Sequence, residues 1–339
     1  MKGLILAAGQ GTRLRPLTLK RSKPMLPVAN QPLIAYPLQK LMYAGITDIG
    51  IVVGENEQEL RAGLSHVPAN LSFIRQAAPK GLADAVRCAR EFCADEEFLL
   101  LFCDNLFFEP LGAALADWHR LRGHHREMEA MIHVISVEDP RAFGVAEVED
   151  GWVTALVEKP EQPKSDLAVL GIDLLTPRIF EMIERIKPSA RGELEITDAI
   201  AALTEAGHRV YARPLNGFWY DTGTFPDLIQ VLRPLMDDFG IYGTQGRYPG
   251  STLKGPVGIG RDSVVTDCEL NGPVMIGAQC QVTGCVLGPY TAVGDRCVLD
   301  NCTLRHAQLY AGTQLSGVLD QEVIYDGELR VDAATPRGT

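Results

Sequence analysis

The chain lacks several features that mark other classes of protein. Its 339 residues include eight cysteines but no C-x-x-C pair, which argues against a zinc ribbon or a redox motif. No apolar stretch approaches the roughly 20 residues of a membrane span, and Met1-Lys2 leads into a short apolar run rather than a signal peptide. The net charge of -11 argues against nucleic acid as a partner. We therefore expect a cytoplasmic protein with no membrane or nucleic-acid partner.

A second absence singles out one segment. No Asp or Glu precedes Asp48, although the chain as a whole is acidic. The apolar run from Leu4 to Ala8 predicts a buried strand, and a loop with two glycines follows it. This loop carries five cations: Arg13, Arg15, Lys20, Arg21 and Lys23. Glycine lets a backbone approach a bound group, and free N–H groups can cradle phosphate oxygens. The purely cationic field favours a polyphosphate ligand.

The glycines do not follow the dinucleotide-binding fingerprint. After Gly9 and Gly11 the third glycine position is Leu14, and no acidic residue lies about 20 positions further on. The whole stretch is more specific: Gly9-Gln-Gly-Thr-Arg-Leu-Arg-Pro-Leu-Thr18, followed by Lys23-Pro-Met-Leu-Pro27. It resembles the signature loop of the sugar-1-phosphate nucleotidyltransferases. The resemblance covers nearly the whole chain, and it is closest to the long-form glucose-1-phosphate thymidylyltransferases that carry a C-terminal β-helix.

The length and the patterning predict two domains. From residue 1 to 238, strand-like and helix-like segments alternate, which is typical of an α/β domain with a mostly parallel sheet. The resemblance implies that this is the Rossmann-like nucleotidyltransferase catalytic domain. Residues 239–252 are expected to be a linker, and residues 327–339 a tail.

Residues 253–326 repeat with a period of 17. Ile259, Ile276 and Val293 open successive units, and Cys268, Cys285 and Cys302 hold the tenth position of each. Such a repeat predicts a parallel β-helix in which equivalent residues stack. It resembles the left-handed β-helices built of hexapeptide repeats. Because stacked side chains point the same way, we interpret the cysteines as core residues rather than as disulfides or metal ligands.

Two aspartates are candidate metal ligands. Asp104 directly follows a continuously apolar strand, 98–103, and so lies at the carboxyl end where open α/β sheets bind ligands. Asp221 lies in the string Trp-Tyr-Asp-Thr-Gly-Thr. Alone, Asp104 fits a plain turn and Asp221 the N-cap of a helix. The resemblance implies that both hold Mg²⁺, which takes carboxylate and phosphate oxygens.

Three further motifs match the family in order. They start at Gln76, Glu158 and Arg191, and the resemblance implies base reading for the first and sugar-phosphate binding for the other two. Surface or helix-face roles stay open for each. The resemblance implies catalytic roles for Arg13, Lys23, Asp104, Lys159 and Asp221. It implies substrate-binding roles for Ala8, Gly9, Gly11, Thr12, Gln76, Gly81, Asn105, Gly144, Glu158, Gly171, Asp173 and Arg191.

The chain also departs from the family. Cys103 replaces a common Gly, Asp84 replaces a usual Gln or His, and Asp173 replaces an aromatic residue near the sugar. A carboxylate at position 173 accepts bonds from hydroxyls or favours an amino sugar, so the departure leaves the acceptor open.

The expected reaction joins two anions. A sugar-1-phosphate, expected to be glucose-1-phosphate, attacks the α-phosphorus of dTTP or UTP, and pyrophosphate leaves. A phosphate dianion needs no general base, so catalysis should rest on positioning and charge neutralisation. Arg13 and Lys23 are assigned to the triphosphate, and Lys159 and Arg191 to the incoming phosphate. A homo-oligomer is expected. One alternative is a non-catalytic regulatory homologue. Another is a bifunctional enzyme with an acyltransferase β-helix, although His306 is the one histidine in residues 253–326 and a poor basis for an acyl-CoA site.

Overall fold

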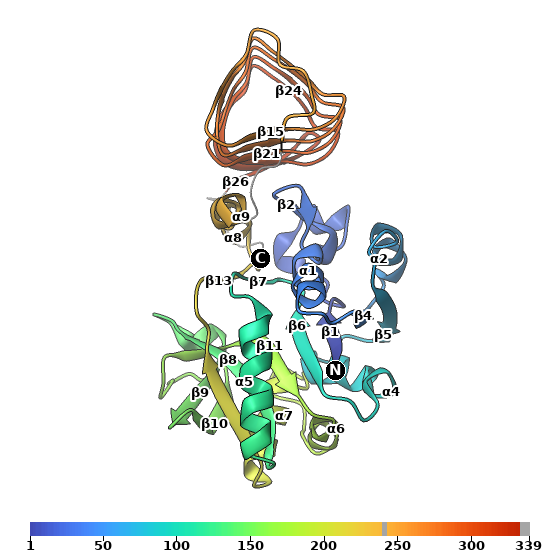
Figure 1. The fold of residues 1–339 in the computed structure, drawn as a ribbon, viewed down its shortest axis with the longest axis vertical. Helices are drawn as coiled ribbons and strands as arrows, with labels where there is room; N and C mark the ends of the chain where they lie inside the picture. Colours follow the sequence, from blue (N-terminus) through green and yellow to red (C-terminus); the bar gives the residue numbers. More distant parts are fainter. Residues whose placement is uncertain (239–242, 333–339) are drawn as a thin grey trace. The chain divides into compact units, whose positions relative to one another are not determined.

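The computed structural model describes residues 1–238 and 243–332 (Figure 1). Two compact units interleave along the sequence: the first comprises residues 1–10 and 34–219, and the second residues 11–33 and those from 220 onward. The signature segment, residues 11–33, therefore groups with the C-terminal part of the chain. The boundaries proposed from the sequence stay predictions, and the linker and the tail each include residues outside the described ranges.

The centre of the first unit is a nine-stranded sheet in the order β5-β4-β1-β6-β11-β8-β12-β10-β9. Its strands are β1 (Lys2–Leu6), β4 (Asp48–Val53), β5 (Asn70–Arg75), β6 (Phe98–Phe102), β8 (Met128–Ser136), β9 (Gly144–Glu149), β10 (Trp152–Glu158), β11 (Leu167–Leu175) and β12 (Arg209–Pro214). The four strands from β5 to β6 are parallel. Beyond them β11 is antiparallel to both of its neighbours, and β8 and β12 are again parallel. The α/β prediction is thus confirmed, with a parallel half and a mixed half.

Helices cover this sheet and close its core. They are α1 (Ala35–Tyr43), α2 (Glu57–Gly63), α3 (Leu82–Cys88), α4 (Arg90–Cys93), α5 (Leu111–His124), α6 (Arg178–Ile183) and α7 (Ile196–Glu205), with a 3₁₀ turn η4 (Pro140–Ala142) and a short strand β7 (Asn105–Phe107). Leu4, Leu100 and Ile132 of the sheet pack with Val86 of α3 and Ile200 of α7 in one buried cluster. This packing fixes α3 and α7 against the strands whose ends carry the candidate site.

In the sequence, His124 and His125 lie in a polar stretch that predicts a surface loop. That expectation is wrong for His124, which ends α5. The helix buries only Leu111, Ala114, Trp118 and Leu121 and keeps a largely polar remainder, so its apolar pattern is weak in the sequence.

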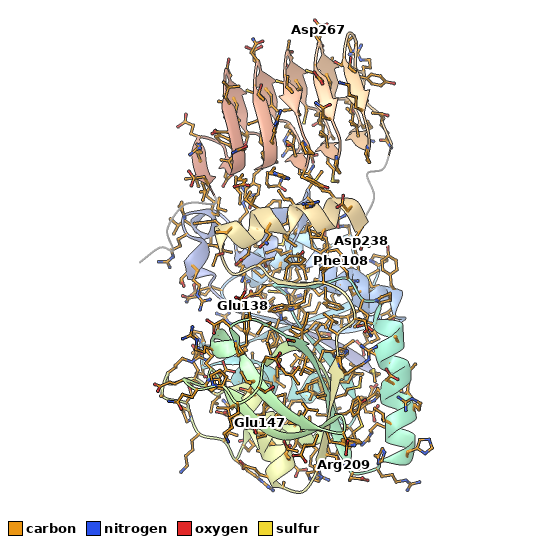
Figure 2. All side chains as sticks on the ribbon, turned by 90° about the vertical axis from the view of Figure 1, so that its left-hand side faces the viewer. Phe108, Glu138, Glu147, Arg209, Asp238 and Asp267 are labelled. Atoms are coloured by element: carbon orange, nitrogen blue, oxygen red, sulfur yellow. The ribbon has the colours of Figure 1, made fainter. Side chains whose placement is uncertain are left out.

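The second unit contains a parallel β-helix. Its strands are β14 (Thr252–Lys254), β15 (Val257–Ile259), β16 (Val264–Thr266), β17 (Glu269–Asn271), β18 (Val274–Ile276), β19 (Gln281–Thr283), β20 (Val286–Leu287), β21 (Thr291–Val293), β22 (Val298–Asp300), β23 (Thr303–Leu309), β24 (Gln314–Ser316) and β25 (Leu319–Asp326). Ile259 pairs with Ile276 and Ile276 with Val293, so the sequence period becomes the spacing of stacked coils. The coils are triangular in Figure 1 and lie in successive layers in Figure 2, which agrees with the predicted left-handed β-helix.

Two details of the repeat are confirmed. In the sequence, Leu309 to Asp320 fits the repeat slipped by one residue, and the structure agrees, because Val293 pairs with Leu309 and Leu299 with Leu315. The cysteines of the repeat are free and buried. The backbone N–H of Cys285 donates to Cys268 Sγ at 3.2 Å, and that of Cys302 to Cys285 Sγ at 3.3 Å. The column is therefore a packed ladder, as expected of core residues.

The rest of the second unit consists of short elements. They are η1 (Thr12–Leu14), η2 (Leu17–Leu19), η3 (Lys23–Met25), β2 (Pro27–Val28), β3 (Gln31–Pro32), α8 (Phe225–Gln230), α9 (Leu232–Asp238) and β26 (Leu329–Asp332), with β13 (Trp219–Asp221) leading into them. A capping box between Thr224 and Asp227 starts α8. No helix among the described residues is long and apolar enough to cross a membrane.

Candidate active site

The first unit gathers candidate residues at one edge of its sheet. Ala8 and Gly9 follow β1, Gln76 follows β5, and Asp104 follows β6. These strands are parallel, so their carboxyl ends meet at the same edge. The backbone there is close-packed: a side chain at Gly54 would lie 3.2 Å from the carbonyl oxygen of Ala8. The sequence placed these residues correctly at strand ends.

The amide of Gln76 has a fixed orientation. Its Nε2 donates to Oδ2 of Asp84 at 2.8 Å and to the carbonyl oxygen of Gly81 at 3.2 Å. Asp84 is 4% exposed and is paired with Arg87. Both partners of Nε2 accept hydrogen bonds only, so they require the NH₂ end of the amide. The acceptor Oε1 is left for a ligand.

Gly81 connects this segment to the loop that carries Arg191. Its φ is +108°, and a side chain there would run into the backbone of Leu194. Two hydrogen bonds hold the contact: Ala83 N donates to Leu194 O at 2.9 Å, and Leu194 N to Lys80 O at 2.8 Å. Only glycine combines this conformation with this close approach. The segment from Gln76 to Ala83 and the Arg191 loop are therefore neighbours.

Two cations converge on Glu158 at the end of β10. The Nζ of Lys159 lies 3.3 Å and the Nη2 of Arg191 3.2 Å from Glu158 Oε1. The two cationic side chains are 35% and 43% exposed, respectively, so they remain accessible to an anion. Lys159 also has a φ of +44°, a conformation that non-glycine residues rarely adopt and that often marks a functional position. Here the structure brings together three residues that the sequence predicted.

Residues that the sequence analysis missed hold this cluster in place. Glu195 is 2% exposed and accepts from Arg191 Nη2 and from Ser189 Oγ, both at 2.8 Å. The hydroxyl of Thr197 donates to Glu158 Oε2 at 3.0 Å. A side chain at Gly144 would collide with Thr197 and approach Glu158. The motif from Arg191 to Asp198 contains both Glu195 and Thr197, but it indicated a role for Arg191 alone.

The carboxylates around this cluster also act on Asp198. Burial is the main cause that raises the pKa of Asp198, and the nearby Glu195 and Glu158 raise it further. Arg191 lowers the pKa of Asp198 and so opposes the two carboxylates. A bound phosphate would rely on Lys159 and Arg191 to offset the negative charge of Glu158 and Glu195.

Asp173 lies in the sheet rather than at its edge. It pairs in register with Leu100 and Ile132, and it is 1% exposed. Both carboxyl oxygens are buried and have no hydrogen-bond partner among the described residues. Burial raises the pKa of Asp173 to about 7. Two residues earlier, Gly171 has a φ of +62° and faces the ring of Phe102, which leaves no room for a side chain. The carboxyl is thus a buried polar group without a partner.

The two predicted metal ligands belong to different units. Asp104 and Asn105 are in the first unit, and Asn105 is buried with its amide donating to the carbonyl oxygen of Leu170. Asp221 is in the second unit at the end of β13, and both carboxylates are half-buried. Glycine at 223 keeps one side of Asp221 clear, because a side chain there would lie 3.3 Å from Oδ1 and 3.4 Å from Oδ2.

Each of these carboxylates by itself suits a hard cation such as Mg²⁺, which is bound through one or two carboxylates together with substrate phosphates. No group of three or more His, Cys, Asp or Glu arranged for a metal occurs in residues 1–238 and 243–332. A site built by protein side chains alone is therefore not indicated there.

In the second unit the signature segment folds back on itself. Gly11 has a φ of +62°, and a side chain there would meet Lys23 and Thr18. The Thr18 hydroxyl donates to Gly11 O at 2.9 Å. Thr12 and Arg13 lie in η1 and are exposed. Gly11, Thr12, Arg13 and Lys23 are thus parts of one compact loop.

Comparison with known proteins agrees with this arrangement. Residues 2–237 match the nucleotidyl transferase family. The chain belongs to that family. A glucose-1-phosphate thymidylyltransferase of Streptomyces griseus is 41% identical over 241 residues, which are 70% of this chain and 66% of that protein. A second one, from Streptomyces antibioticus, is 38% identical over 77% of this chain and 72% of its own length. The chain thus spans about two thirds of the first of these relatives.

Solved structures show the same fold. A Bacillus anthracis protein assigned as a glucose-1-phosphate thymidylyltransferase, crystallised with sucrose, aligns with a TM-score of 0.64 at 32% identity, over 72% of this chain and 98% of its own. A UDP-glucose pyrophosphorylase complexed with UDP-glucose aligns with a TM-score of 0.62 at 29% identity, over 70% of this chain and 98% of its own. The prediction of a sugar-1-phosphate nucleotidyltransferase is confirmed at the level of family and reaction type.

Proposed function

We propose that this chain transfers a pyrimidine nucleoside monophosphate from dTTP or UTP to glucose-1-phosphate or a related sugar-1-phosphate and releases pyrophosphate. One observation carries the proposal. The contact between Gly81 and Leu194 places the fixed amide of Gln76 in the same part of the first unit as the cations of Lys159 and Arg191. The group proposed to read the base and the cations proposed to bind the sugar phosphate therefore lie on either side of one backbone contact, between residues 80–83 and Leu194.

The orientation of Gln76 supports the choice of base. With Nε2 held by Asp84 and Gly81, the free Oε1 accepts a hydrogen bond and has none to give. Thymine and uracil carry an N–H at position 3, whereas cytosine has an acceptor there. The site therefore favours dTTP and UTP over CTP. Thymine is placed first because the relatives from Streptomyces are named thymidylyltransferases.

The cations of the chain would organise the reaction. Lys159 and Arg191 bind and orient the sugar phosphate, while Arg13 and Lys23 of the signature loop bind the triphosphate. When bound, Mg²⁺ would be held by Asp104 and Asp221 and would offset the negative charge of the phosphates. The attacking oxygen is already a dianion oxygen, so no side chain has to remove a proton. Positioning of two reactants is worth roughly 7–11 kcal/mol in favourable cases.

The acceptor sugar is proposed from the relatives. Asp173 is 1% exposed inside the sheet, so it is not assigned a direct contact with the sugar. Glucose-1-phosphate is the first acceptor to test, because the Streptomyces relatives are named glucose-1-phosphate thymidylyltransferases, and glucosamine-1-phosphate is the second.

The remaining expectations join this proposal. We propose a cytoplasmic homo-oligomer, since the relatives act on soluble nucleotides and isolated coils of a β-helix bury little surface by themselves. A non-catalytic homologue would be expected to lack a metal aspartate or a phosphate-binding lysine. Asp104, Asp221, Lys23 and Lys159 are all present, so catalysis is favoured over that alternative.

The acyltransferase alternative is weaker. In the β-helix, His306 stacks on the ring of Tyr290, with ring centroids 5.2 Å apart and planes 8° apart. Incubation of the protein with acetyl-CoA and glucosamine-1-phosphate tests it directly. We expect no release of free CoA.

The experiment for the main proposal is a substrate matrix. Pyrophosphate release is measured for dTTP, UTP, CTP, ATP and GTP against glucose-1-phosphate and glucosamine-1-phosphate, with Mg²⁺ present or chelated. We expect turnover with dTTP or UTP and with Mg²⁺. Turnover with CTP at the same efficiency would overturn the assignment of Gln76, and a protein inactive with every pair would favour the non-catalytic alternative.

A further inference from the structure

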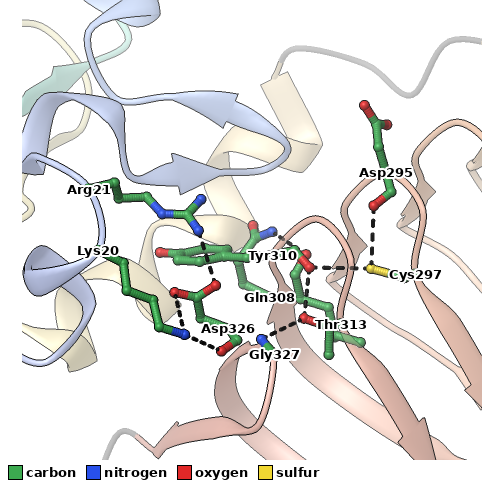
Figure 3. Close-up of polar contacts among 10 residues, drawn as sticks. Lys20, Arg21, Asp295, Cys297, Gln308, Tyr310, Thr313, Asp326 and Gly327 are labelled. Carbon is green, nitrogen blue, oxygen red and sulfur yellow. Dashed lines mark hydrogen bonds and ion pairs between the residues drawn. The ribbon is translucent and has the colours of Figure 1, made fainter. Parts of the chain in front are cut away.

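Within the second unit, hydrogen bonds and ion pairs connect the signature segment, residues 11–33, to the end of the β-helix. Asp326, the last residue of β25, accepts a hydrogen bond of 3.0 Å from Arg21 Nη2 on its Oδ1. Lys20 Nζ donates to the backbone oxygen of Asp326 at 2.9 Å and lies 3.5 Å from its Oδ2. Figure 3 shows both cations reaching the same carboxylate. These residues are 305 and 306 positions apart in the sequence.

The carboxylate at the centre of this contact is buried, although the side chain of Lys20 is 52% exposed. The side chain of Asp326 is 7% exposed and that of Arg21 is 26% exposed. The guanidinium of Arg21 lies over the ring of Tyr310, 4.9 Å from its centroid, and Tyr310 is 1% exposed. A carboxylate in such a place depends on its cations, because removal of one partner leaves an uncompensated buried charge.

The turn that presents Asp326 is itself rigid. The buried hydroxyl of Thr313 donates to the carbonyl oxygen of Tyr310 at 2.7 Å and accepts from the backbone N–H of Gly327 at 3.2 Å (Figure 3). Asp326 also pairs with Leu329 in the β25–β26 ladder. The carboxylate is therefore held by the body of the β-helix.

A second attachment holds the other end of the segment. Gln308 is 2% exposed, and its Oε1 accepts from the backbone N–H of Ala29 at 2.9 Å. Asn30 Nδ2 donates to the carbonyl oxygen of Val293 at 2.8 Å. Ala29 and Asn30 both have positive φ and form the tight turn between β2 and β3. Lys23, which the proposed function assigns to the triphosphate, lies between the two attachments in the sequence.

We propose that Asp326 is a positioning residue for nucleotide binding. Four of the five cations of the signature loop form two pairs: Asp326 engages Lys20 and Arg21, and Arg13 and Lys23 serve the triphosphate. Without the Asp326 carboxylate, Lys20 and Arg21 lose this counter-charge and the loop has one attachment fewer. The nucleotide must then order the loop when it binds, and the free energy spent on this ordering weakens binding. The β-helix thereby helps to position the loop that binds the nucleotide. The statement about the triphosphate rests on the proposed function.

The first test needs no substrate. Trypsin cleaves after Lys20 and Arg21, so its rate of cleavage there reports how firmly the loop is held. We compare the full-length protein with Asp326→Asn and with a matched control, Asp320→Asn. Asp320 is also on β25 and pairs with an arginine, Arg330, at 2.9 Å. We expect roughly tenfold faster cleavage in Asp326→Asn and wild-type cleavage in Asp320→Asn.

The second test uses steady-state kinetics with dTTP, glucose-1-phosphate and Mg²⁺. We expect Asp326→Asn to raise the KM for dTTP about tenfold and to leave the KM for glucose-1-phosphate unchanged, with partial recovery in Asp326→Glu. A lower melting temperature with unchanged cleavage and unchanged KM for dTTP would show a merely structural role and would overturn the proposal.

The two tests also separate this proposal from the proposed function. If the wild-type protein shows no turnover with any nucleotide, the proposed function fails, and the trypsin comparison still decides the role of Asp326. If Asp326→Asn does not fold, Lys20→Gln replaces it, since the Arg21–Asp326 pair remains. Cleavage after Arg21 should then rise by about threefold, and an unchanged rate would overturn the proposal.

Discussion

Gln76 donates from Nε2 to Oδ2 of Asp84 across 2.8 Å, and this bond decides which end of the amide a ligand meets. Asp84 is buried, and Arg87 supplies its counter-charge. The residue types matter here, since a carboxylate can only accept and therefore cannot tolerate the oxygen of the amide. In the proposed function, Asp84 acts on the base through Gln76.

Replacement of Asp84 by Ala should relax base selection. Gln76 then keeps only the longer bond to Gly81, and its amide can turn to present either end. We expect the ratio of kcat/KM for dTTP to that for dCTP to fall by about tenfold, the size of one hydrogen-bond preference. Glu91→Ala, an exposed acidic residue of the neighbouring α4, is the control and should keep the wild-type ratio. An unchanged ratio in Asp84→Ala would refute this role.

Arg191→Ala should act on the sugar phosphate alone. The guanidinium bridges Glu158 and Glu195 and is partly exposed, so its loss removes one of two cations for the incoming phosphate. We expect the KM for glucose-1-phosphate to rise about tenfold or more, with the KM for dTTP unchanged. Arg178→Ala, which removes an exposed pair with Glu181, should change neither. A selective loss of dTTP affinity in Arg191→Ala would contradict the assignment.

Asp173 makes stability depend on pH in a defined direction. Burial raises its pKa to about 7 in the folded protein, whereas an unfolded chain loses this proton near pH 4. Between these values only the folded state holds the proton, so its stability falls as pH rises, by about 1.4 kcal/mol per pH unit at most, and levels off above pH 7. Asp173→Asn should lack this fall.

The measurement is the free energy of unfolding in urea at several pH values for both proteins. The difference between Asp173→Asn and the wild-type protein should grow from pH 5 to pH 7. Parallel curves would show that Asp173 is ionised or has gained a partner.

The sequence predicted much of the fold because the strongest patterns are local. The apolar strand predicted at residues 98–103 is β6 (Phe98–Phe102), and the column of Ile259, Ile276 and Val293 follows from the period alone. The last coil's slip was also visible in the sequence. By contrast, α5 was missed because a helix with one narrow buried side has little apolar periodicity.

For the candidate site too, the sequence revealed residues in local motifs but not their distant partners. Gln76, Glu158 and Arg191 stood in recognisable strings, so their positions were found. Glu195 and Thr197 were missed as partners, since Thr197 reaches Glu158 across 39 positions. Asp326 is a stronger case: its contact with Lys20 spans 306 positions. No pattern in a single sequence pairs residues so far apart, because only the packing of the folded chain brings them together.

The central claim is that Asp104 and Asp221 support a Mg²⁺-dependent transfer between two anions, and Asp104→Asn tests it most directly. Pyrophosphate release from dTTP and glucose-1-phosphate is compared in the wild-type protein, in Asp104→Asn and in the exposed control Asp95→Asn, with Mg²⁺ and with EDTA. We expect Asp104→Asn to lose roughly 100-fold or more in kcat with an unchanged circular dichroism spectrum. EDTA should abolish turnover in all three proteins, and Asp95→Asn should match the wild type. Full activity of Asp104→Asn, or turnover that persists in EDTA, would contradict the account.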